Sequence, residues 1–369
     1  MSSARPVSLS AALQTSIVLC QRFAASLAPN SPVEVPQSES TAPSPLVLLH
    51  AAATTLRAQV TKLSLLAITA PFTPSAATTC LLPLNESILT SLVTAALLTT
   101  PDKTIPAFSA ECRNLAATAL RDMQTFLRLL EARSQTENHT TELDEREKAG
   151  FTEATGKVWD DCDKLLPLAA DGVTGYVVRK SKQWLDLMKD AVKELQDWDP
   201  EDDIDEHDPF GINHSDHEDS DNPNENEHNN DRAAISAGVK EQALKVLNRI
   251  PQSIHVVIKQ RLERMPTDTA NTAGQMCQMD TLLKRIRHIS ELIDESAEGM
   301  YLGDLELCLK KAGEARALTI EVVESVLRPI SEMNATTAAP VETNEDRYVQ
   351  RALEWIRQVD PGVSSRKPT

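Results

Sequence analysis

The chain of 369 residues carries a formal net charge of −17, with 41% hydrophobic residues, 4% aromatic residues and 11 glycines. Ala, Leu, Val and Thr dominate, which favours helix bundles over sheets, because sheets need aromatic and β-branched runs bounded by glycine turns. Fifteen acidic residues and no Lys or Arg lie between Asp197 and Asp231, and no basic cluster elsewhere indicates phosphate-backbone binding, so we expect no direct nucleic-acid partner.

The N-terminal third is predicted to form helices separated by prolines. The predicted helices cover about residues 8–27, 46–69 and 87–98, and another begins after Pro106. The uncharged stretch 63–85 is long enough to span a bilayer, but Pro71, Pro74 and Pro83 interrupt it, so we predict no membrane partner.

Residues 1–33 have two readings. They contain Arg5, Arg22, several serines and no acidic residue, a composition that resembles a mitochondrial transit peptide. The alternative, which we favour, is an ordinary first helix with an apolar face formed by Leu13, Ile17, Cys20 and Leu27.

The next predicted helix contains the stretch TGKVWDDCDKLLPLA, residues 155–169. Its apolar residues recur at the helical period and predict one buried stripe. That stripe consists of Val158, Trp159, Cys162, Leu165 and Leu166, and it resumes after Gly175 with Trp184, Met188, Ala191, Leu195 and Trp198. The charged residues Asp160, Asp161, Asp163 and Lys164 are predicted to face solvent on the other side.

Residues 199–231 contain too few apolar residues to offset the entropy of ordering, so we predict a disordered acidic linker. Helical patterning returns after Arg232, with helices over about 233–250 and on to Met265. Later stripes consist of Met279, Leu282, Ile286, Ile289 and Ile293, then Ile320, Val323 and Leu327, and finally Tyr348, Ala352 and Trp355. The sequence therefore predicts an all-α protein, with helical halves at 1–198 and 232–369 joined by the linker 199–231.

No stretch carries a strong chemical motif. The six cysteines lie far apart without a CxxC pair, which favours buried free thiols over a zinc site or disulfides. There is no glycine-rich phosphate loop, GxSxG or HExxH motif. Asp160 and Asp163 have the i, i+3 spacing of a carboxylate pair, but no third ligand is in reach, so we expect no metal site there.

The acidic segment offers weaker candidates. Residues 197–208 have acids at alternate positions like a calcium loop, but Asp202 replaces the required glycine and Asp208 the required glutamate. His207, His214, His217 and His228 also lie here, and ENEH at 225–228 is a single Glu-x-x-His element where a di-iron bundle needs two. Ser215, three residues before Glu218, is a candidate phosphorylation site.

The stretch TGKVWDDCD resembles the cyclin-D-binding protein family of the GCIP type, helix-loop-helix proteins without a basic region. The family motif falls on Thr155, Gly156, Val158, Trp159, Cys162 and Asp163, residues that we expect to be structural. The segments DAVKELQDW and MDTLLKRIRHISELIDESAEGMY (279–301) are also similar to the family. The resemblance implies a helical, non-catalytic protein without cofactors that binds D-type cyclins or helix-loop-helix transcription factors in cell-cycle control, in nucleus and cytoplasm.

Two other functions stay open at this point. The acidic segment could make the chain a calcium- or metal-responsive protein, and the N-terminal composition could make it a mitochondrial helical protein. The leading prediction is a protein-protein interaction regulator, because amphipathic helical stripes run through both halves.

Overall fold

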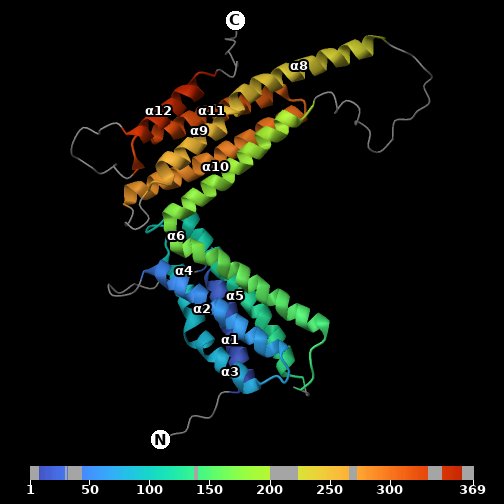
Figure 1. The fold of residues 1–369 in the computed structure, drawn as a ribbon, viewed down its shortest axis with the longest axis vertical. Coiled ribbons are helices and arrows are strands. Elements are labelled where there is room, and N and C mark those ends of the chain that lie inside the picture. Colours follow the sequence, from blue (N-terminus) through green and yellow to red (C-terminus); the bar gives the residue numbers. More distant parts are fainter. Residues whose placement is uncertain are drawn as a thin grey trace. The chain divides into compact units, whose positions relative to one another are not determined.

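The structure is a computed structural model, and it describes residues 8–29, 31, 44–136, 140–199, 223–265, 272–330 and 343–359. For residues 223–233 it describes the backbone alone. The described residues form helices and no β-strand (Figure 1), so the predicted all-α class is confirmed. The chain divides into two compact units, an N-terminal unit (Met1–Tyr176) and a C-terminal unit (Val177–Thr369).

The N-terminal unit is a helical bundle around a core rich in Leu and Ala. Its elements are α1 (Leu9–Ser26), α2 (Pro45–Ile68), α3 (Pro74–Pro83), the π-helical segment η1 (Leu84–Ile88), α4 (Leu89–Leu98), α5 (Pro106–Ser134) and the first part of α6 (Glu145–Asp197). Helix α1 packs along α5, and α2 packs on α4. Proline at the first or second position begins α2, α3 and α5, where its missing N–H would have no partner within the helix.

The C-terminal unit is a second helical bundle. It contains the remainder of α6, α8 (Pro223–Leu247), α9 (Arg249–Val257), the π-helical segment η2 (Ile258–Leu262), α10 (Ala273–Tyr301), α11 (Leu305–Ser325) and α12 (Asn344–Arg357). Helices α10 and α11 form a closely packed hairpin, in which Gly299 faces the backbone of Cys308. The predicted stripe of α10, from Met279 to Ile293, is fully buried, so that prediction is confirmed.

Helix α6 is interrupted at Gly172, whose φ of 62° and ψ of −159° lie outside the helical region. Glycine adopts a positive φ at little cost, whereas residues with a Cβ are strained there. The helix passes through Pro167, and the interruption falls five residues later. The division between the units follows at 176–177, inside α6. The predicted linker stays a prediction over residues 200–222, which lie outside the described part, whereas the described backbone of residues 223–231 belongs to α8.

Several other boundaries differ from those predicted. The sequence missed α3 and placed the end of a helix at Pro251, which instead lies in the first turn of α9. Helix α8 begins at Pro223, ten residues before the predicted start at Ala233. The run from Pro74 to Leu98 is long and apolar enough to cross a membrane by length and composition, but more than half of it is buried inside the N-terminal unit.

Candidate functional site

The family-like stretch on α6 packs against α2 through a polar ladder. Its side chains at positions i, i+4 and i+8 lie on one face of α6 and meet α2 in antiparallel order. The three rungs are Thr155 Oγ1 to Ser64 Oγ at 2.9 Å, Trp159 Nε1 to Thr61 Oγ1 at 3.0 Å, and Arg57 Nε to Asp163 Oδ1 at 3.0 Å. The ladder fixes the register between these two helices.

The middle rung carries the largest side chain of the stretch. Trp159 is half-buried, its indole N–H donates to Thr61, and the Arg57 guanidinium lies 5.2 Å from the centre of its ring. Arg57 also pairs with Asp163, so one cation bridges the tryptophan and the carboxylate. Both charged partners are substantially exposed, so this pair contributes little to stability by itself.

The other motif residues have packing roles. Val158 and Cys162 are completely buried, as predicted, and burial raises the pKa of the Cys162 thiol to about 12. A thiol of that pKa is protonated at neutral pH and is not a nucleophile. Gly156 is exposed, and a Cβ added there would meet nothing within 4 Å. No contact explains why glycine stands at this position.

The prediction for Asp161 was wrong. It was expected on the solvent side, but only 4% of the residue is exposed. The reason is the helical period: Asp161 follows Val158 by three residues and precedes Leu165 by four, so it continues the seam that both of them form. Its Oδ2 atom is buried and has no hydrogen-bond donor among the described residues.

Asp161 faces a second carboxyl group, that of Asp122 on α5. Burial, together with the charge of Asp122 and a hydrogen bond between the two carboxyls, raises the pKa of Asp161 to about 7. Lys164 opposes this shift and Asp160 adds to it, each by its charge. Two adjacent carboxylates cannot both ionise without strong repulsion, so the pair holds a proton more tightly than an isolated carboxyl does.

These groups do not assemble a metal site. The described residues contain no cluster of three or more His, Cys, Asp or Glu side chains that could hold a metal ion. Asp160 pairs with Lys164 at 2.5 Å and Asp163 pairs with Arg57, so the carboxylates of the stretch diverge toward different partners. The geometry supports helix packing and a shared proton.

The candidates of the acidic segment lie outside the described residues. These are Ser215, the histidines at 207, 214 and 217, and most of the calcium-like stretch 197–208; at His228 the backbone alone is described. All six cysteines are free, and Cys20, Cys112, Cys162 and Cys308 are buried, which confirms the prediction of buried free thiols for these four.

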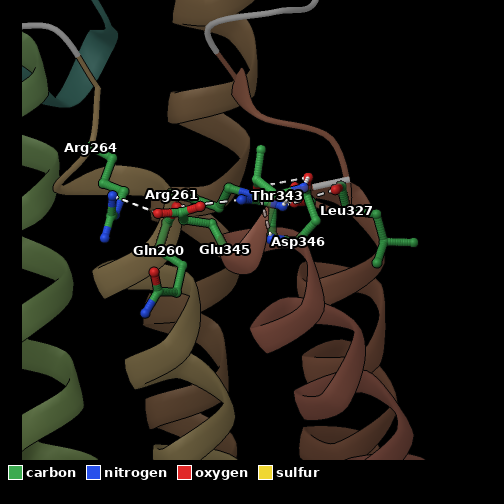
Figure 2. A network of polar contacts seen from close by, with 8 residues as sticks. Gln260, Arg261, Arg264, Leu327, Thr343, Glu345 and Asp346 are labelled. Atoms are coloured by element: carbon green, nitrogen blue, oxygen red, sulfur yellow. Dashed lines mark hydrogen bonds and ion pairs between the residues drawn. The ribbon is translucent and has the colours of Figure 1, made fainter. Parts of the chain in front are cut away.

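A polar network in the C-terminal unit was not predicted. Figure 2 shows the Arg261 side chain of η2 between the end of α11 and the start of α12. Its Nε donates to the Val326 carbonyl at 2.7 Å, and its Nη2 donates to the Leu327 carbonyl at 2.9 Å and to Asp346 Oδ1 at 2.6 Å. The guanidinium thus caps the C-terminal end of α11, where the helix dipole favours a cation.

Asp346 connects this cation to the first turn of α12. It forms a capping box with Thr343, whose backbone N–H donates to Asp346 Oδ2 at 2.9 Å. Burial by itself would raise the pKa of Asp346, but the hydrogen bonds from Thr343 and Arg261 and the Arg261 charge hold it below its usual value. Beside it, Arg264 pairs with Glu345 at 2.7 Å (Figure 2). The network is a structural tie between three helical elements.

A third feature is the outward face of α2 in the N-terminal unit. Val47 and Leu65 are 62% and 57% exposed, and Ala51, Thr54 and Ala58 between them are exposed too. The Thr54 hydroxyl donates to the His50 carbonyl at 2.8 Å, so it turns its polar group toward its own helix. These five residues, here termed the α2 outer face, recur at steps of four, three, four and seven, the spacing of a helix-packing seam.

One comparison with known proteins gives a match. Residues 48–201 match the model of the family described as Grap2 and cyclin-D-interacting, N-terminal. The matched region runs from the first turn of α2 to beyond the end of α6, so it contains the polar ladder, the Asp122–Asp161 pair and most of the α2 outer face. The match confirms the family resemblance over these residues. No curated protein and no solved structure matches the chain.

Proposed function

We propose that this chain is a non-catalytic helical regulator that binds a D-type cyclin through the α2 outer face. The observation that carries the proposal is that a helix within the family-matched region presents an apolar seam to solvent. Apolar side chains exposed at helix-packing spacing form a surface that another helix can cover. The family description supplies the partner class.

The inner and outer sides of α2 have separate tasks in this proposal. The inner side holds α6 through the polar ladder and thereby makes the face rigid. The outer side offers exposed apolar residues together with Lys62, which lies between Ala58 and Leu65 at the same helical spacing, and α2 itself contains no Asp or Glu. A rigid face loses less entropy on binding than one that must be ordered first.

Calorimetric titration of the full chain with a purified D-type cyclin tests the proposal. Leu65→Glu and Val47→Glu are each expected to weaken binding at least about tenfold, because a charge placed in an apolar contact must be desolvated. Both positions are exposed, so the free energy of unfolding should change by less than about 0.5 kcal/mol. Leu302→Glu, at a position 73% exposed in the C-terminal unit, is the matched control.

The proposal fails if the wild-type chain does not bind the cyclin, or if Leu302→Glu weakens binding as much as Leu65→Glu does. The second partner class is the helix-loop-helix transcription factors, whose helices suit the helix-packing spacing of the α2 outer face. Titration with a helix-loop-helix domain in the same way tests this class.

A cell-cycle role in nucleus and cytoplasm is part of the same proposal. It requires the chain to be in the compartments where cyclins act. Imaging of the full chain with a fluorescent protein fused to its C-terminus checks this. Mitochondrial fluorescence would instead support the transit-peptide alternative for residues 1–33.

A further inference from the structure

The C-terminal unit contains a groove between the last turns of α6 and the first turns of α9. Its volume is about 620 Å³. One wall carries Lys189, Val192 and Lys193 of α6, and the other carries Pro251, His255 and Val256 of α9. On each wall these residues recur at helical spacing, so two helix faces bound the groove side by side.

The floor of the groove is apolar. Val192 and Pro251 are buried and Val256 is half-buried. The space between two helix faces with such a floor has the shape that a third helix fills, with its side chains packed between theirs. An apolar stripe on the incoming helix would remove this floor from water.

The rim of the groove is cationic. Lys193 is exposed and has no ion-pair partner among the described residues. Lys189 pairs with Asp186 at 3.0 Å, but both side chains are more than half exposed, and such pairs exchange partners at little cost. No acidic residue of the described part lines the groove, although the whole chain carries a net charge of −17.

We infer that this groove binds an acidic amphipathic helix of a partner protein, with the apolar stripe of that helix on Val192, Pro251 and Val256 and its carboxylates toward Lys189 and Lys193. The apolar floor selects for a helical stripe, and the unpaired cation on the rim selects for negative charge. The inference goes beyond the proposed cyclin contact, because it concerns the other unit and does not depend on what binds the α2 outer face.

Selection from a displayed peptide library tests the inference on the full chain. Each 18-residue peptide has leucines at heptad positions a and d, and its flanking positions vary among Glu, Lys, Gln and Ala. We expect the selected pool to be enriched in Glu on one flank. Recovery of that pool should fall at least tenfold with the charge reversal Lys193→Glu, and again as salt is raised.

Lys310→Glu is the matched control, because Lys310 is an exposed lysine of α11 outside the groove. Circular dichroism should show the same helix content in all variants. A selected pool without acidic bias, or one recovered equally by the Lys193→Glu and Lys310→Glu chains, would overturn the inference. So would binding that arises only after deletion of residues 200–222, because the groove would then serve the chain's own acidic segment.

Discussion

Asp161 in the N-terminal unit and Arg261 in the C-terminal unit are both buried charged residues, each 4% exposed, but the protein accommodates them in opposite ways. Arg261 has a carboxylate and three backbone carbonyls within hydrogen-bond distance, so its charge is fully paired. Asp161 has another carboxyl group beside it and an unpaired oxygen. A buried charge is kept where partners surround it, and it is neutralised by a proton where they do not.

The largest effect is expected for Arg261→Ala. This change leaves Asp346 without its cation and two helix-terminal carbonyls without a donor, which should lower the free energy of unfolding by about 3–5 kcal/mol. Urea denaturation measures it. Arg264→Ala is the control, because the Arg264–Glu345 pair is mostly exposed on the arginine side and should contribute less than about 1 kcal/mol. Equal losses from both variants would show that Arg261 is not the tie between α11 and α12.

Gly299→Ala tests close packing in the C-terminal unit. The added Cβ would lie 2.9 Å from the backbone N of Cys308, so the α10–α11 hairpin must open. We expect a loss of about 1–3 kcal/mol, as for other overpacked contacts. Gly238→Ala on α8 is the matched change, since a Cβ there meets nothing within 4 Å. In thermal denaturation, the melting temperature of Gly299→Ala should lie below that of the wild-type chain and that of Gly238→Ala above it. If both melting temperatures shift in the same direction, the close packing at Gly299 is contradicted.

Asp161→Asn should raise the free energy of unfolding, whereas Arg261→Ala should lower it. The amide reproduces the protonated carboxyl and can donate to Asp122, so at pH 8 the variant should be more stable by at least about 1 kcal/mol. Because the pKa of Asp161 rises from 3.8 to about 7 in the folded chain, protonation stabilises the fold. That contribution is complete below about pH 3.8 and is lost as the pH rises through 7.

The advantage of Asp161→Asn should therefore shrink as the pH falls from 8 to 4, as measured by urea denaturation at each pH. Asp163→Asn, at a side chain 54% exposed, is the control and should change stability by less than about 0.5 kcal/mol at both pH values. A pH-independent gain for Asp161→Asn would mean that the wild-type side chain does not change protonation in this range.

Gly156→Ala is expected to have the smallest effect. Alanine is the better helix former and has open space at this position, so the free energy of unfolding should rise by about 0.5–1 kcal/mol. If the variant is stabilised but binds the cyclin more weakly, glycine serves contact with the partner at this position. Destabilisation would show that the backbone of α6 is not regular at Gly156.

Much of the fold could be predicted from the sequence because hydrophobic periodicity is strong. The α10 stripe and the ends of α1 and α2 follow it to within a few residues. In the second part of α6 the buried seam consists of Ser181, Leu185, Met188, Val192 and Leu195, whereas the predicted one included Trp184 and Trp198. Both tryptophans are half-buried, because large rings lie at the edge of a seam with one side exposed.

Both buried charges were missed for the same reason. Asp161 stands between Val158 and Leu165, and Arg261 stands between Ile258 and Met265, each at steps of three and four. A charged residue at a seam position is the signal that could have found them. The charge of a residue by itself predicts that its side chain faces solvent. Whether a buried charge has a partner depends on the neighbouring helices, as with Arg261 and Asp346, which are 85 residues apart in the sequence.

The segment TGKVWDDCD packs α6 against its neighbouring helices, and the buried Asp161 carboxyl within it holds its proton up to about pH 7 in the folded chain. A ¹³C NMR titration of the aspartate carboxyl groups in the full chain, with Asp161→Asn used to assign the resonance, tests this directly. We expect the Asp161 carboxyl to titrate with a midpoint near pH 7, far above the usual value of 3.8. A midpoint below about pH 5 would contradict it, because Asp161 would then be ionised at neutral pH although its buried Oδ2 atom has no hydrogen-bond donor among the described residues.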